Sequence, residues 1–178
     1  MANKEALRDL QTRLAERMRE ARTEHRAATW LAVESAGVGF LLPLVEAGEI
    51  FPLGVVLPVP HTAAWFVGVA NLRGGLHGVV DLAGFLGLRR APVSGAPEGA
   101  REQTRVVAFG AALETNCALL FERLSGLRGR EQMTALPRGA QALPAFVGGQ
   151  YRDEAGRVWL ELNLAALAGD EAFLKIMV

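Results

Sequence analysis

Two opposite charges stand at the ends of the longest stretch of this chain that has no acidic, lysine or arginine side chain. Glu49 precedes the stretch and Arg73 follows it, and residues 50–72 contain no Asp, Glu, Lys or Arg. A carboxylate and a guanidinium in apolar surroundings are costly unless they pair, because pairing offsets the desolvation of both. If the strands that flank the stretch lie close together, Glu49 and Arg73 can form such a pair. This ion pair would then either stabilise a turn locally or support a binding surface.

The chain lacks the motifs of the common catalytic and cofactor sites. It has no Gly-x-x-x-x-Gly-Lys-Ser/Thr phosphate loop, no His-Glu-x-x-His zinc motif and no Gly-x-Ser-x-Gly nucleophile turn. The histidines have no metal-ligand spacing; they are His25, His61 and His77. Helix capping and solvation explain the isolated Asp81 and Glu122 more simply than acid–base catalysis does. We therefore expect no enzyme activity, no cofactor and no metal.

The composition argues against several classes of partner. The 178 residues include 19 Lys plus Arg and 19 Asp plus Glu, for a formal net charge of zero, and 51% of them are hydrophobic. Because the positive and negative charges balance, the composition lacks the excess of basic residues that nucleic-acid-binding proteins carry. Residues 50–72 contain three prolines and do not suit a membrane helix, so we expect no membrane insertion. The single cysteine, Cys117, is predicted to be a buried, inert thiol in a reducing cytoplasm, and the charged residues near the N-terminus indicate no secretion signal.

The elements that must position Arg73 are two strands. The apolar runs 66–70 and 76–80 flank a glycine-rich turn, and Asp81 follows them as the predicted cap of a short helix. Further short apolar runs are predicted as strands at 30–33, 38–42, 55–59, 106–109, 117–121, 145–147 and 158–162. Closely spaced strands with turns between them predict small barrels or a sandwich.

The pattern that follows Phe66 returns after Phe146. Phe66-Val67-Gly68 leads through a turn and a strand to Asp81, and Phe146-Val147-Gly148 leads in the same way to Asn163, which can also cap a helix. Two such copies predict two similar barrels. Their division is expected near residues 91–102, a loop rich in Pro, Gly and Ala, and residues 129–144 form a second loosely patterned stretch.

The first 28 residues are predicted as a separate charged, amphipathic helix ahead of a domain over residues 29–178. Within residues 4–26, apolar side chains recur at spacings of three and four and the other side is charged; they are Leu7, Leu10, Leu14, Met18 and Ala21. The apolar side either packs on the chain's own domain or meets another subunit. Because it covers barely two heptads, the first interpretation is favoured.

Several of these residues resemble the signature of CheW-like domains, the adaptor modules of bacterial chemosensory complexes. The resemblance rests on Gly68-Val69-Ala70-Asn71-Leu72-Arg73-Gly74, on Val79-Val80-Asp81-Leu82, and on Glu49-Ile50 at the distance upstream that the family keeps. It covers roughly residues 29–169. It implies a mainly β, CheW-like fold of two small five-stranded β-barrels with short helices, to which the N-terminal α-helix is added.

The resemblance also implies a function. A CheW-like protein is a non-catalytic adaptor that couples the cytoplasmic tip of a methyl-accepting chemotaxis receptor to the regulatory domain of a CheA-type histidine kinase. It is cytoplasmic and recruited to membrane-associated receptor arrays. Residue by residue, the receptor- and kinase-binding surface would comprise Glu49, Val67, Gly68, Asn71, Arg73 and Gly74, with Asp81 and Asn163 as structural caps.

Within the family, the N-terminal charged helix and residues 30–34, 48–53 and 58–62 look most like the adaptors of type IV pilus twitching motility. Two alternatives stay open at this point. One is a small-molecule-binding double β-barrel, and the other is a CheW-like adaptor with a different chemosensory output.

Overall fold

The structure, a computed structural model, describes residues 13, 28–89, 103–137 and 143–178. The predicted helix over residues 4–26, apart from Arg13, and the predicted loop over residues 91–102 lie outside the described residues. Within the described ranges the fold is mainly β with a few short helices, as the sequence predicts. No helix in these ranges is long and apolar enough to cross a membrane.

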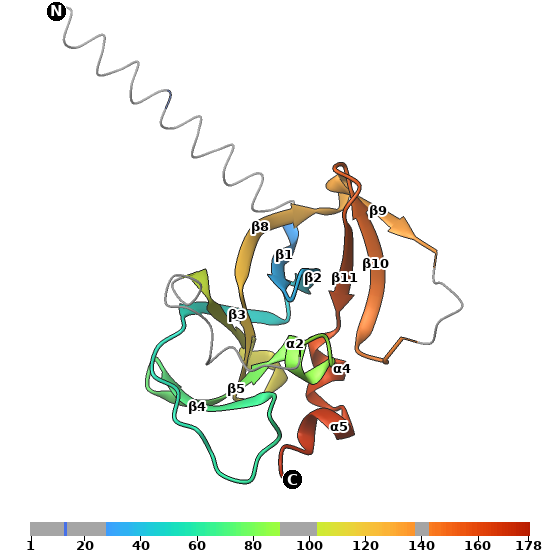
Figure 1. The fold of residues 1–178 in the computed structure, drawn as a ribbon. Coiled ribbons are helices and arrows are strands. Elements are labelled where there is room, and N and C mark those ends of the chain that lie inside the picture. The colour runs from blue at the N-terminus through green and yellow to red at the C-terminus, as the bar shows by residue number, and fades with distance from the viewer. Residues whose placement is uncertain (1–12, 14–27, 90–102, 138–142) are drawn as a thin grey trace, which may run out of the picture.

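The strands form two curved sheets, and the short helices lie beside the junction of the two (Figure 1). The six-stranded sheet has the order β8-β1-β2-β11-β10-β9, and the five-stranded sheet has the order β3-β6-β7-β5-β4. The six-stranded sheet consists of β1 (Ala28–Ser35), β2 (Val38–Pro43), β8 (Arg123–Gly129), β9 (Met133–Leu136), β10 (Val147–Asp153) and β11 (Val158–Leu162). The five-stranded sheet consists of β3 (Ala47–Pro52), β4 (Phe66–Leu72), β5 (Gly75–Asp81), β6 (Arg105–Phe109) and β7 (Cys117–Phe121).

The helices of the described residues are all short. They are α2 (Leu82–Phe85), α4 (Leu164–Ala168), α5 (Glu171–Leu174) and the 3-10 turns η2 (Ala111–Leu113) and η3 (Arg130–Gln132). Asp81 caps α2, because its Oδ1 accepts the Gly84 N–H at 3.2 Å. Asn163 caps α4 in the same way, with the Ala166 N–H at 2.7 Å from its Oδ1. Both caps are therefore confirmed.

The chain passes from one sheet to the other twice. It leaves the six-stranded sheet after β2, builds the whole five-stranded sheet from β3 to β7, and returns with β8. Residues 91–102 connect β5 to β6, which belong to the same sheet, so the sheets do not divide at this loop as the sequence suggests. The sequence pattern misses this arrangement because the pairings of β1 with β8 and of β2 with β11 join distant parts of the chain.

The internal repeat is present in both sheets. The hairpin β4–β5 is followed by α2, and the hairpin β10–β11 is followed by α4. Each hairpin has a register shift just inside its first pair, between Phe66 and Gly68 in one and between Val147 and Gln150 in the other. Each second strand then pairs in parallel, β5 with β7 and β11 with β2. The two hairpin–helix units thus occupy equivalent places in the two sheets.

The main core lies between the sheets. Both contribute buried side chains to one cluster, among them Leu31, Val33, Phe40 and Leu42 from the six-stranded sheet and Val80, Val107, Leu119 and Phe121 from the five-stranded sheet. β7 is buried along its whole length, as expected for a central strand. Cys117 belongs to this cluster, and burial raises the pKa of its thiol to about 12. The prediction that this thiol is buried is confirmed.

Three strands escape the sequence pattern because exposed side chains interrupt their apolar runs. These are β3, β8 and β9. β9 lies within residues 129–144, which the sequence presents as loosely patterned, and it adds a sixth strand where five are expected. Conversely, the predicted strand over residues 55–59 is absent, and only Leu57 forms a bridge, with Val69. Pro58 has no N–H to continue the pairing.

Candidate functional site

Arg73 and Gly74 are the two residues of the β4–β5 turn. Their neighbours Leu72 and Gly75 pair across the hairpin, and their φ angles are 49° and 85°. Two positive φ angles define a type I′ turn, whose twist suits a hairpin and which favours glycine. The Asn71 side chain reinforces the turn, because its Oδ1 accepts the Gly74 N–H at 2.7 Å. Asn71 and Gly74 therefore shape the turn that presents Arg73 to solvent.

Glu49 and Arg73 form the ion pair that the sequence predicts. Arg73 Nη1 lies 2.6 Å from Glu49 Oε1, and the pair joins β3 to the β4–β5 turn. The surroundings differ from the expectation, because the Arg73 side chain is 75% exposed and that of Glu49 is 52% exposed. Little desolvation has to be offset, and exposed pairs of this kind contribute at most about 1 kcal/mol to stability. The uncharged stretch between the two residues does not bury them.

The ion pair bridges the mouth of a cavity, which we call the seam. The seam lies between β3 with its continuation, residues 53–56, on one side and the β4–β5 hairpin on the other. Its volume is about 340 Å³. β3 and β4 are the two end strands of the five-stranded sheet, so the seam separates two strand edges that do not pair with each other. Its lining is largely apolar and includes Phe51, Leu53, Leu72, Val79 and Val106.

Three exposed apolar side chains belong to the elements that form the walls of the seam or follow them. Val55 is 82% exposed, Leu57 61% and Leu76 62%. Val55 lines the seam, Leu57 bridges to β4, and Leu76 follows the turn in β5. Large apolar side chains gathered at a surface are typical of interaction sites.

Gly68 and Val67 differ from the other predicted surface residues. Gly68 is buried, and Val67 is half-buried. Gly68 has a φ of +140°, and a Cβ built on it would lie 2.2 Å from the Leu57 carbonyl oxygen. The backbone at Leu57 can lie against β4 only because residue 68 has no side chain. The structure therefore brings Glu49, Asn71, Arg73 and Gly74 together at the surface, whereas Gly68 is buried farther along β4, against Leu57.

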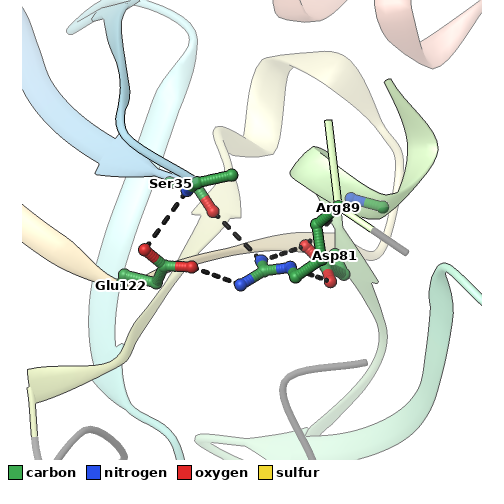
Figure 2. A network of polar contacts seen from close by, with 6 residues as sticks. Ser35, Asp81, Arg89 and Glu122 are labelled. Carbon is green, nitrogen blue, oxygen red and sulfur yellow. Dashed lines mark hydrogen bonds and ion pairs between the residues drawn. The ribbon is translucent and has the colours of Figure 1, made fainter. Parts of the chain in front are cut away.

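A second polar cluster joins the two sheets and was missed by sequence reasoning (Figure 2). Arg89 Nη2 bonds Asp81 Oδ1 at 2.7 Å, and Arg89 Nε bonds Asp81 Oδ2 at 3.1 Å. The same guanidinium donates to Glu122 Oε1 and to Ser35 Oγ. Ser35 ends β1 and Asp81 ends β5, while Glu122 lies at the crossing from β7 to β8. Asp81 is therefore both a helix cap and an ion-pair partner.

Glu34 is the centre of a third cluster, on β1. Arg123 and Arg157 each donate to its carboxylate, at 2.7 and 2.8 Å, and Ser125 donates as well. Burial alone would raise the pKa of Glu34, but the hydrogen bonds from Arg157, Ser125 and Arg123 outweigh it and lower the pKa to about 2. This cluster ties β1 to β8 and to the β10–β11 hairpin, so its role is structural.

The described residues offer no group of three or more His, Cys, Asp or Glu side chains that could hold a metal ion. His61 lies in an exposed loop, and the His77 ring contacts the Gly75 carbonyl of its own strand. Within the described ranges, the surface built around Glu49 and Arg73 is thus a candidate for docking a partner.

Comparisons with known proteins identify relatives of this chain. A sequence model of the CheW-like domain family matches residues 29–172. Protein PilI of Pseudomonas aeruginosa is 31% identical over 158 residues, which cover 83% of this chain and 83% of that protein. Among solved structures, the scaffolding protein TtCheW from Thermoanaerobacter tengcongensis has a similar fold, with a TM-score of 0.62 and 17% identity. That similarity covers 78% of this chain and 85% of the other.

Proposed function

The chain belongs to the CheW-like domain family, and on that premise we propose that it is a non-catalytic adaptor between a methyl-accepting chemotaxis receptor and a CheA-type histidine kinase. The docking surface in this proposal comprises Glu49, Asn71, Arg73 and Gly74, with Val67 at its margin. Gly68 contributes indirectly, by allowing the backbone at Leu57 to lie against β4. The protein acts in the cytoplasm, where receptor arrays recruit it.

The observation that carries the proposal is the exposed Glu49–Arg73 pair at the mouth of an apolar seam. Because both side chains are largely exposed, the ion pair adds little to the stability of the fold. Fold stability therefore does not explain why two charged residues are placed there. Arg73 also stands on a two-residue turn, which limits its backbone freedom before a partner arrives. A rigid turn, a charge pair and exposed apolar side chains together are typical of a docking surface.

The output that we propose is type IV pilus twitching motility. The support is the 31% identity with Protein PilI, whose match extends over most of both chains. An adaptor of the same fold that serves another output would retain the docking surface but require other receptors. The receptors and kinase encoded near the gene distinguish these two cases.

Co-purification from cells tests the proposal. The tagged full chain is expected to retain the regulatory domain of the CheA-type kinase, and the Arg73→Glu variant is expected to lose it, because two carboxylates would then face each other across the seam. Arg152→Glu is the matched control, since Arg152 is an exposed arginine of the six-stranded sheet. Loss of the kinase domain by both variants, or by neither, would contradict the assignment of the surface.

A further inference from the structure

Prolines limit the addition of a strand along the outer wall of the seam. Pro52 belongs to that wall, Pro58 and Pro60 follow it in the chain, and none of the three has an N–H to donate. The N–H and the carbonyl of Leu57 are already bonded to Val69, at 2.8 Å each. Prolines on an edge disfavour the addition of another strand. Strand addition along the outer wall is therefore disfavoured, and the seam offers a partner apolar and charged side chains.

The interior of the seam suits an apolar group. Leu72 and Val79 come from the β4–β5 hairpin, Val106 from β6, and Phe51 and Leu53 from the outer wall. A volume of about 340 Å³ is near the lower end of the range of ligand pockets, roughly 300–1,000 Å³. It is large enough to hold one large side chain. Transfer of such a side chain out of water is the main source of affinity at a central anchor.

The rim of the seam has binding capacity that the Glu49–Arg73 pair does not use. Arg73 contacts Glu49 through Nη1, and three quarters of its side chain is exposed, so further guanidinium N–H groups face solvent. A guanidinium can bind a carboxylate through two parallel hydrogen bonds, whereas here it makes one. An exposed pair also exchanges partners at low cost. A second carboxylate can therefore join or replace Glu49 on Arg73.

We propose that the seam receives one large apolar side chain of the kinase regulatory domain, and that a carboxylate beside that side chain binds Arg73. The apolar anchor fills the space above Val79 and Val106, and the partner's carboxylate joins or replaces Glu49 at the rim. This inference rests on the proposed function for the location of the partner, and it adds the chemistry that the partner must present.

The first test fills the seam in the full chain. Ala70 lines the seam and is nearly buried, so Ala70→Leu occupies part of the space. Ala64→Leu, at an exposed alanine outside the seam, is the matched control. Titrated with the kinase regulatory domain, Ala70→Leu is expected to bind at least tenfold more weakly and Ala64→Leu like the wild type. Unchanged binding by Ala70→Leu overturns the inference, and the proposed function stands if Arg73→Glu still abolishes binding.

The second test needs no kinase and applies even if Ala70→Leu fails to fold. The probes are two acetylated tripeptide amides, Phe-Asp-Gly and Phe-Lys-Gly, added to the isotopically labelled full chain and followed by NMR. The Asp peptide is expected to shift the amide signals of residues 49–56 and 70–73 at concentrations at least threefold lower than the Lys peptide. Arg73→Gln is expected to remove this difference. Equal responses to the two peptides, or shifts confined to other residues, overturn the inference.

Discussion

At the scale of single residues, the sequence predicts which groups meet at the surface but not how exposed they are. The turn residues, the Glu49–Arg73 contact and both helix caps could be predicted, because each depends on local backbone geometry or on the attraction between two opposite charges. Their exposure could not, because a stretch without charges does not have to be buried. Residues 53–61 show this, since most of them are exposed in spite of their apolar character.

Gly68 is predicted to be essential for folding rather than for direct contact with a partner. In Gly68→Ala the new methyl would collide with the Leu57 carbonyl and strain a φ of +140°, so we expect a loss of about 2 kcal/mol or more. Urea denaturation measures it. Gly54→Ala is the control, because its Cβ meets nothing within 4 Å. Equal stability of the two variants would contradict this assignment.

Glu34 is predicted to make stability depend on acid pH. Because its pKa is about 2 in the folded chain and about 4.3 when unfolded, its stabilising contribution is complete above pH 4.3 and is lost as the pH falls towards 2. The contribution amounts to at most about 3 kcal/mol. Urea midpoints measured between pH 7 and pH 2 should converge for wild type and Glu34→Gln as the pH falls. A constant difference between them would refute the prediction.

At the scale of elements, most long, apolar strands could be predicted, whereas edge strands and the contacts between elements could not. β1, β2, β4 to β7 and β11 contain apolar runs that identify them as strands. β3, β8 and β9 lack such runs, because exposed side chains interrupt them. Arg89 bonds residues up to 54 positions away in the chain. No spacing rule connects such residues, so only the fold brings them together.

The Arg89 cluster is predicted to stabilise the junction of the two sheets. Arg89→Met removes the cation that neutralises Asp81, whose side chain is only 3% exposed. An uncompensated buried charge typically costs about 3–5 kcal/mol. Urea denaturation is expected to show a loss of this size, with partial recovery in the double variant Asp81→Asn, Arg89→Met. Arg152→Met, an exposed arginine, serves as the control. A loss no larger than that of the control would show that the cluster is not needed.

At the scale of the whole molecule, each sheet depends on both halves of the chain. β1 and β2 come from the first half, but their neighbours β8 and β11 come from the second. In the same way, β3, β4 and β5 require β6 and β7. The sequence repeat suggests two similar barrels divided near residues 91–102, whereas in the structure each repeated hairpin pairs with a strand of the other half.

This exchange of strands predicts that the halves cannot fold alone. Fragments 1–94 and 95–178, cut within the β5–β6 connection, are expected to lack cooperative thermal unfolding when separate. Mixed in equal amounts, they are expected to recover the circular dichroism of the intact chain in one transition. Cooperative unfolding of either fragment by itself would contradict the interlocked arrangement of the sheets.

We propose that the surface around Arg73 docks the regulatory domain of a CheA-type kinase. Calorimetric titration of that domain into the full chain measures this contact, together with Arg73→Glu and the control Arg152→Glu. We predict that the wild type and Arg152→Glu bind with the same affinity. Arg73→Glu should bind at least tenfold more weakly, a difference of about 1.4 kcal/mol, with an unchanged melting temperature. Equal affinity of all three proteins would contradict the claim.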